Sequence, residues 1–300
     1  MQRKIRLNIL FFISLSFILI FSVKTLSAQE KIELALHECI KMALDNNRNF
    51  PNASDNKISK YFDRIFKSFS EEKEKIRKNK GKTVYKIKTL YYDLLLAKEL
   101  IQLADEVKSN FEEAYEKAEK KLESEDPDIT QQDVLKLKLG LVGSKDELNG
   151  LEHDKKEINE SLKYKLGILG NKIFDIKSKR LKQEKIDLKK VEGNIDLTLS
   201  NKSSFKEKEE IFRITKVFLK INKANDSIKT AREARKVSRG LLVTNLANFD
   251  FGIGEAKDLF ESLFIYRRSV KNYLTKIHEY NIAVAELSYE TGKDSDNWGY

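Results

Sequence analysis

The stretch that decides the fold runs from Thr83 to Glu125 and reads TVYKIKTLYYDLLLAKELIQLADEVKSNFEEAYEKAEKKLESE. Its apolar side chains recur at nearly every third or fourth position, which is the spacing of one face of an α-helix. Asp126-Pro127-Asp128 breaks this pattern, and Thr130 with Asp133 then forms a helix start signal close to a capping box. A second helix is predicted from there to Lys165. Because the break is short, we expect the two helices to lie antiparallel as a hairpin.

The same pattern returns downstream. One apolar stripe extends from Ser204 to about Leu246, and another extends from Glu255 to about Tyr289. Gly292 follows the last stripe, and glycine is the expected residue just past a helix end. The sequence therefore predicts an all-α fold of two long antiparallel helical hairpins that form an elongated bundle.

The two hairpins are predicted to be copies of each other. A shift of 127 residues aligns Ala97 with Ala224, and a shift of 125 aligns Gly167 with Gly292. The two-residue slip falls near the hairpin tips. Chance matching of helical periodicity is the alternative, but the break and the closing glycine recur together with the stripe, which favours duplication.

Shorter segments flank the hairpins. Leu34 to Asn47 and Tyr61 to Phe69 predict short helices, and Lys78 to Lys82 is either an interruption or a weak point in a longer helix. A lysine-rich helix is predicted at about Phe174 to Val191, and Ile195 to Leu199 fits either a strand or the cap of the next helix. We divide the chain into a signal peptide (1–28), N-terminal short helices (29–82), the first hairpin (83–167), a connecting segment (168–203), the second hairpin (204–292) and a flexible tail (293–300).

The first 28 residues have the layout of a secretory signal peptide. Three basic residues precede an apolar stretch from Ile9 to Val23, and small residues end the segment at Ala28. An uncleaved membrane anchor is the alternative. We expect an exported protein of the periplasm or of the outer-membrane side of the cell envelope, with its membrane association left open.

Composition excludes several classes of protein. The 300 residues include 12 glycines and 2 prolines, too few for the turns of an all-β fold. Without residues 1–28 the chain has 53 basic and 47 acidic residues, interspersed as on solvated helix faces. Nucleic-acid binding needs a concentrated basic face, so we expect no nucleic-acid partner.

No group of residues predicts catalysis. Cys39 is the single cysteine, which excludes a disulfide framework within one chain. His37 lies two residues from Cys39, a spacing that does not bring both side chains to one helix face, so a buried free cysteine is favoured over a metal ligand. His153 and His278 are predicted to be solvated. We expect no enzyme activity, no cofactor and no metal.

Three segments together resemble the TolC-type outer-membrane efflux protein family. They are the opening helix at 32–47 with its Ala43-Leu44-Asp45-Asn46-Asn47 ending, the segment 91–99 (YYDLLLAKE), and the segments 251–262 and 280–287 with Thr291-Gly292. The resemblance implies a trimer whose subunits each contribute two helical hairpins to a periplasmic tunnel. It also implies two β-hairpins in a shared membrane barrel, but 50–82 and 200–212 read as helix and charged loop rather than barrel strands. We therefore expect the helical part without an evident β-barrel.

The resemblance implies that the hairpin tips engage a periplasmic adaptor or an inner-membrane transporter. Apolar side chains in an exposed turn often mark an interface, although local packing of the same side chains is equally compatible with the sequence. The expected function is a non-enzymatic tunnel or scaffold component of an efflux or transport assembly. The rival hypothesis is a periplasmic coiled-coil chaperone or stalk that grips client proteins. The candidate contact residues are Asp126, Pro127, Asp128, Phe249, Phe251, Gly252, Ile253 and Gly254.

Overall fold

The computed structural model describes residues 31–46, 62–170, 172–200 and 205–292. The predicted signal peptide, the predicted break at 50–54 and the tail 293–300 lie outside the described residues. In chain order the elements are β1 (Lys31–Leu34), α2 (Leu36–Asn46), α3 (Phe62–Glu123), α4 (Gln131–Leu166), β2 (Ile173–Ile176), α5 (Leu188–Ser200), α6 (Phe205–Asp250) and α7 (Ala256–Thr291).

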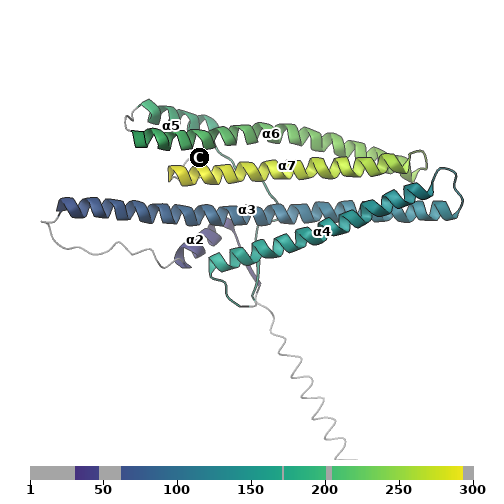
Figure 1. Ribbon diagram of the computed structural model, residues 1–300, viewed down its shortest axis with the longest axis horizontal. Helices are drawn as coiled ribbons and strands as arrows, with labels where there is room; N and C mark the ends of the chain where they lie inside the picture. Colours follow the sequence, from purple (N-terminus) through teal and green to yellow (C-terminus); the bar gives the residue numbers. More distant parts are fainter. Residues whose placement is uncertain (1–30, 47–61, 171, 201–204, 293–300) are drawn as a thin grey trace, which may run out of the picture.

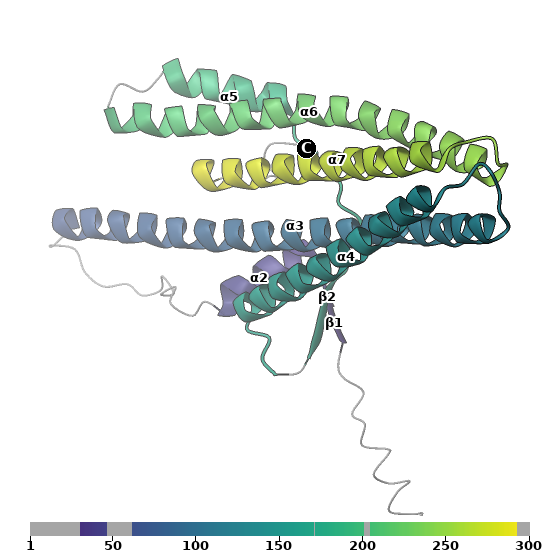
Figure 2. The same ribbon diagram turned by 45° about the vertical axis from the view of Figure 1, so that its right-hand side comes forward.

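Four long helices form an elongated bundle, which confirms the predicted fold class. α3 and α4 form one antiparallel hairpin, α6 and α7 form the other, and the two hairpins join through α3 and α7. Along most of the molecule the helices therefore follow the order α6, α7, α3, α4, and both hairpin tips lie at the same end (Figures 1 and 2). α6 and α4 are the outer helices of this arrangement.

The two hairpins have matching bounds. α4 and α7 each contain 36 residues and begin 125 positions apart, and each ends at a left-handed glycine, Gly167 at φ 70° and Gly292 at φ 65°. The last residues of α3 and α6, Glu123 and Asp250, lie 127 positions apart. The two-residue slip therefore falls in the tip loops, as predicted, while a common origin of the hairpins stays a prediction.

α3 is longer than predicted. It starts at Phe62 and continues through the charged segment 78–82. The alternative of a longer helix through 78–82 is therefore confirmed, and the separate short helix and the interruption are wrong. One glycine costs a helix only about 1 kcal/mol relative to alanine, too little to end a helix of 62 residues. A Cβ on Gly81 would lie 3.3 Å from the Tyr289 ring of α7, so this glycine allows close packing. The proposed boundary after residue 82 thus falls inside one helix.

Two short parallel strands connect parts of the chain that are far apart. β1 pairs with β2, with Ile32 opposite Phe174 and Leu34 opposite Ile176. The alternation in β2 buries Phe174 and Ile176 while Ile173 is exposed, which is the pattern of a half-buried strand. The predicted helix at 174–191 is therefore wrong for most of its length. Residues 195–199 lie inside α5, so both alternatives for them, a strand and the cap of the next helix, are wrong.

Residues 177–187, which we call the strap, have no regular secondary structure. Side chains of neighbouring helices satisfy its backbone instead. The Leu181 N–H donates to the Glu99 carboxylate of α3 at 2.9 Å. The fully buried amide of Asn281 on α7 accepts from the Glu184 N–H at 2.9 Å and donates to the Lys182 carbonyl at 2.8 Å. The strap thus ties the two hairpins together near the middle of the molecule.

The apolar core has two parts. The middle cluster lies where α2, β2 and the strap meet the long helices, and the tip cluster fills the space between the two hairpins near their tips. In the tip cluster the Phe111 ring makes edge contacts with Phe260 at 5.8 Å and with Phe264 at 5.7 Å. A Cβ on Gly140 would come within 2.5 Å of Phe111, so α4 approaches this ring at the glycine.

Candidate functional site

The first hairpin tip is polar and satisfies much of its own backbone. The Asp126 N–H donates to the Lys121 carbonyl at 3.1 Å, and the Asp126 carboxylate accepts from the Asp128 N–H at 3.0 Å. Pro127 is exposed between them. This tip therefore presents two carboxylates and a proline. The start of α4 behind it is confirmed as a capping box formed by Thr130.

The second hairpin tip is apolar. Phe251 is 79% exposed and Ile253 is 77% exposed. Gly252 takes a φ of 73°, and a Cβ on Gly254 would lie 2.7 Å from Asn248, so the tight turn depends on glycine at both positions. Full burial of each apolar side chain against a partner would contribute about 1.5–3 kcal/mol. This tip is therefore the stronger candidate for a contact surface.

Phe249 does not belong to the exposed set: of the two alternatives, local packing holds for this side chain and the exposed position is wrong. α6 continues to Asp250, one turn further than predicted, and this turns the Phe249 ring into the tip cluster, where it is 2% exposed. The Lys121 ammonium of α3 lies 5.6 Å from the ring centroid. Phe249 therefore stabilises the tip from inside and is not available to contact a partner.

The structure brings the two tips together. The Lys117 ammonium of α3 lies 2.7 Å from the Asp250 carboxylate at the end of α6. Hydrogen bonds to Asp250 and to Glu113 raise the pKa of Lys117. Exposed ion pairs contribute at most about 1 kcal/mol, so this contact orients the tips more than it stabilises them. Of the predicted site residues, Asp126, Pro127, Asp128, Phe251, Gly252, Ile253 and Gly254 thus occupy neighbouring loops at one end.

The outer edges of the bundle are surfaces that sequence reasoning missed. On α4, Leu135, Leu139 and Val142 are 56%, 68% and 55% exposed. They follow one another at four- and three-residue steps, so they form one stripe. Periodicity alone places Leu135 and Leu139 among the apolar positions of this helix. However, α4 carries two apolar stripes, and the buried one is Val134, Leu137 and Leu141.

α6 carries a matching stripe on the opposite edge. Phe212, Leu219, Val237 and Leu241 are 68%, 61%, 71% and 40% exposed, and at about 100° per residue they lie within roughly 40° of one another around the helix. Val237 and Leu241 lie in the last turns of α6, near the tips, as the α4 stripe does in the first turns of α4. Both edges therefore expose apolar side chains at the same height.

The edges differ in charge. Residues 145–161 of α4 contain six carboxylates and three lysines, whereas residues 216–239 of α6 contain eight lysines or arginines and two carboxylates. Both segments lie in the central part of the outer helices. Glu147 of the first segment and Lys220 and Arg235 of the second contact α7 of the same chain. The other residues leave an excess of carboxylates along α4 and an excess of basic side chains along α6, which favours contact between an α4 edge and an α6 edge.

A polar network surrounds the strap. The Tyr91 hydroxyl bonds the Ser178 hydroxyl at 2.8 Å, and the Tyr92 hydroxyl donates to the Glu184 carboxylate. Burial raises the pKa of Tyr92, and the charge of Glu184 raises it further. Sequence periodicity gave no signal for this network, because it places Tyr91 in the apolar stripe and does not indicate a partner for either tyrosine. The network fixes the middle of the molecule.

The residues tested for chemistry are mostly structural. Cys39 is a free, fully buried cysteine, as predicted, and burial raises the pKa of its thiol to about 12. His153 is exposed. His278 is instead half-buried, with its Nε2 atom 2.7 Å from the Asp93 carboxylate of α3, so the prediction of a solvated ring is wrong. Among the described residues, no group of three or more His, Cys, Asp or Glu side chains is placed to hold a metal ion.

No helix within residues 31–46, 62–170, 172–200 and 205–292 is long and apolar enough to cross a membrane.

Comparisons with known proteins support the fold. No protein-family model matches the chain, and no curated protein matches it either. Among solved structures, the transmembrane channel protein CusC is 12% identical, with 74% of this chain and 71% of that chain covered and a TM-score of 0.60. The outer membrane channel CmeC of Campylobacter jejuni is 10% identical (77% and 68% covered, TM-score 0.59). The channel MtrE of Neisseria gonorrhoeae is 9% identical (74% and 68% covered, TM-score 0.58). At this identity the likeness concerns the fold: the chain has the helical fold found in outer-membrane channels.

Proposed function

We propose that the chain is a non-enzymatic wall element of a TolC-like helical tunnel in the cell envelope, built from several copies of itself. The observation that carries the proposal is the pair of outer edges. One copy offers an acidic α4 edge with an apolar stripe near the tip, and the next copy offers a basic α6 edge with an apolar stripe at the same height. Edge-to-edge contact of this kind repeats from copy to copy, and it gives a closed ring when the rotation between neighbouring copies divides a full turn.

The resemblance to the TolC-type family supplies the further expectations. It suggests three copies, a position in the periplasm or at the outer membrane, and a role in efflux or transport. The fold likeness to outer-membrane channels supports the same reading. In this proposal the tips, with Phe251 and Ile253 exposed, contact a periplasmic adaptor or an inner-membrane transporter.

Assembly is the first test. The full chain, expressed with its own N-terminal segment and purified from the envelope, is expected to run as a defined oligomer in native mass spectrometry. Val237→Glu on α6 and Leu139→Glu on α4 are each expected to give monomers, because either carboxylate would be buried in the contact. Val243→Glu is the matched control. Val243 is 58% exposed on the same helix, but it lies six residues from Val237 and hence about 120° around it.

Charge reversal tests the pairing of the edges. Lys223→Glu on α6 is expected to weaken the oligomer, and Glu157→Lys on α4 in the same chain is expected to restore part of it. A wild-type chain that stays monomeric and suppresses aggregation of an unfolded client would contradict the proposal and support the chaperone hypothesis.

The tip contact needs its own experiment. A photo-crosslinking residue at position 251 in cells is expected to capture an adaptor or transporter subunit, and the Phe251→Asp variant is expected to lose transport while remaining oligomeric. The same crosslinker at position 243 is the control. Crosslinking at 251 only to other positions of this chain would contradict an adaptor contact.

A further inference from the structure

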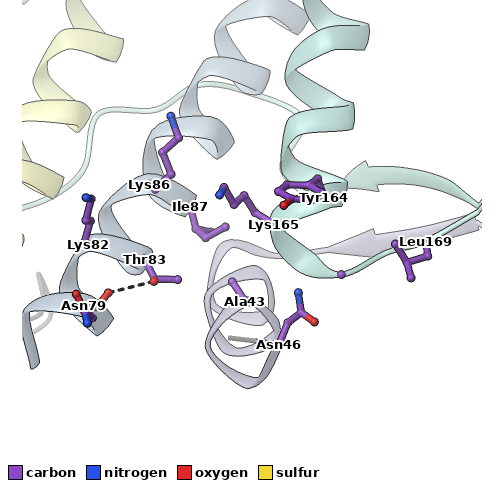
Figure 3. Close-up of a pocket in the computed structure, with 11 residues that line it drawn as sticks. Ala43, Asn46, Asn79, Lys82, Thr83, Lys86, Ile87, Tyr164, Lys165 and Leu169 are labelled. Atoms are coloured by element: carbon purple, nitrogen blue, oxygen red, sulfur yellow. Dashed lines mark hydrogen bonds between the residues drawn. The ribbon is translucent and has the colours of Figure 1, made fainter. Parts of the chain in front are cut away.

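A recess lies between the ends of α2 and α4 and the first half of α3, away from the tips and the outer edges (Figure 3). Its volume is about 630 Å³, which is in the range of small-molecule sites. Ile87 of α3 is 1% exposed at its apolar base, and Leu169 is 78% exposed at its rim. The recess is thus large enough for a small organic molecule or for the headgroup of a lipid.

The charged side chains of this recess all have the same sign. Lys82 and Lys86 lie one turn apart on α3, and Lys165 extends toward α3 from the last turn of α4 (Figure 3). Within the residues that the structure describes, no carboxylate lines the recess. Among the described residues none of the three ammonium groups forms an ion pair. Three lysines in one concave site with no carboxylate partner in the described part of the chain favour an anion.

Neutral hydrogen-bonding groups complete the lining. The amides of Asn46 and Asn79 and the hydroxyl of Tyr164 line the same recess. Lys165 also lies 5.3 Å from the Tyr164 ring centroid. Gly167, at φ 70°, forms part of the wall, where a Cβ would come within 2.6 Å of the Asn46 amide. Amides and a phenol suit hydroxyl groups next to the anion.

The negative ends of two helices offset only part of the positive charge of the three lysines. α2 ends at Asn46 and α4 ends at Leu166, and each helix C-terminus carries roughly half a negative elementary charge. Two such ends offset about one of the three lysine charges, so an excess of about two positive charges remains. A phosphate group carries a charge of this size and accepts hydrogen bonds from several ammonium groups at once.

We propose that this recess binds the phosphate group of a small hydroxylated molecule, such as a glycerophosphate. Lys82, Lys86 and Lys165 hold the phosphate, and Asn46, Asn79 and Tyr164 contact the hydroxylated part. A free phosphorylated molecule and the headgroup of an anionic lipid share this chemistry. The site requires no assembly of several copies, so its test is independent of the tunnel proposal.

Titration calorimetry of the full chain with glycerol 3-phosphate at low salt tests the soluble source. Sedimentation with phosphatidylglycerol vesicles, compared with phosphatidylcholine vesicles, tests the lipid source. The triple variant Lys82→Gln/Lys86→Gln/Lys165→Gln is expected to weaken whichever interaction occurs by at least about tenfold. The matched triple variant Lys41→Gln/Lys179→Gln/Lys189→Gln removes three exposed lysines outside the recess and is expected to bind like the wild type.

The two arms separate the outcomes. Saturable glycerol 3-phosphate binding that only the recess variant loses supports a soluble ligand. Selective binding to phosphatidylglycerol vesicles that only the recess variant loses supports a lipid headgroup. Absence of saturable binding to either probe, or equal weakening by the two triple variants, would overturn the proposal. The lysines would then serve to offset the helix ends, and the recess variant would show only a lower melting temperature.

Discussion

The two hairpins share one backbone plan and differ in the side chains that they present. α4 and α7 begin 125 positions apart and have equal length, yet the first tip carries carboxylates and a proline while the second carries exposed Phe251 and Ile253. The outer edge of the first hairpin is acidic and that of the second is basic. Under the proposed function these differences are complementary, because the first hairpin of one copy meets the second hairpin of the next.

Within the second hairpin tip, buried side chains that stabilise the hairpin differ from exposed side chains that could contact a partner. Phe249 and Phe251 are two residues apart, and only one of them faces the core. Phe249→Ala is expected to lower the free energy of unfolding by about 3–5 kcal/mol, since it removes a fully buried ring. Phe251→Ala is expected to change it by no more than about 0.5 kcal/mol. Denaturant unfolding followed by far-UV circular dichroism measures both, and equal losses would contradict the placement of Phe249.

The close contact between α3 and α4 at Gly140, which we call the seam of the first hairpin, has no counterpart in the second hairpin. Phe111 packs over Gly140, whereas the positions 127 and 125 residues further on are Ser238 and Ile265. Gly140→Ala is expected to cost about 1–3 kcal/mol, because its methyl group would lie within 2.5 Å of the ring.

Gly143→Ala is the control for this seam. Gly143 lies on the same helix with open space at its Cβ position, so the substitution is expected to stabilise by up to about 1 kcal/mol. Thermal unfolding of the two variants measures the difference. A Gly140 variant as stable as the Gly143 variant would contradict the close approach of α4 to Phe111.

The N-terminus of α4 has a side-chain cap, whereas the N-terminus of α7 has none. Thr130 forms a capping box with Asp133, while Glu255 makes no side-chain cap although Asp258 lies at the matching position. Thr130→Ala is expected to cost about 1 kcal/mol. Glu255→Thr is expected to gain about 0.5–1 kcal/mol by creating the missing box. Melting temperatures that move in the same direction for both variants would refute this difference.

Alkaline pH distinguishes the middle of the molecule from its tips. The thiol of Cys39 in the middle cluster has a pKa raised by burial to about 12, against 9.0 when exposed. Its contribution to stability is therefore present below about pH 9 and is lost as the pH rises from about 9 to about 12. At neutral pH this group therefore gives stability no dependence on pH. The unfolding free energies of the wild type and the Cys39→Ala variant, each measured at about pH 8 and about pH 11, test this loss. A difference between wild type and variant that is the same at both pH values would contradict it.

Sequence predicted the long helices because their ends carry local signals. Thr130 with Asp133, Gly167 and Gly292 act within a few residues, and the observed helix bounds follow them closely. The break at Asp126–Asp128 was found for the same reason. Such signals persist whatever packs against the helix.

The remaining features depend on distant partners. Lys31–Leu34 and Ile173–Ile176 are each only four residues long, too short for their alternation to predict a strand pair. The lysine-rich strap is not helical because the side chains of Glu99 and Asn281 bond its backbone. Leu135 and Leu139 read as core residues because periodicity alone does not tell a buried stripe from an exposed one. At the candidate site, the loops were predicted correctly, whereas the burial of Phe249 depends on one extra helical turn.

The parallel pairing of β1 with β2 has a consequence for the order of folding. The two strands are separated by the whole first hairpin, so synthesis must reach Ile176 of the 300 residues before Lys31–Leu34 can find its partner. Each hairpin, by contrast, closes through neighbours along the chain, and contacts between distant segments form more slowly than local ones. The first hairpin is therefore expected to form before the small sheet during synthesis, because its helices are complete before β2 has been made.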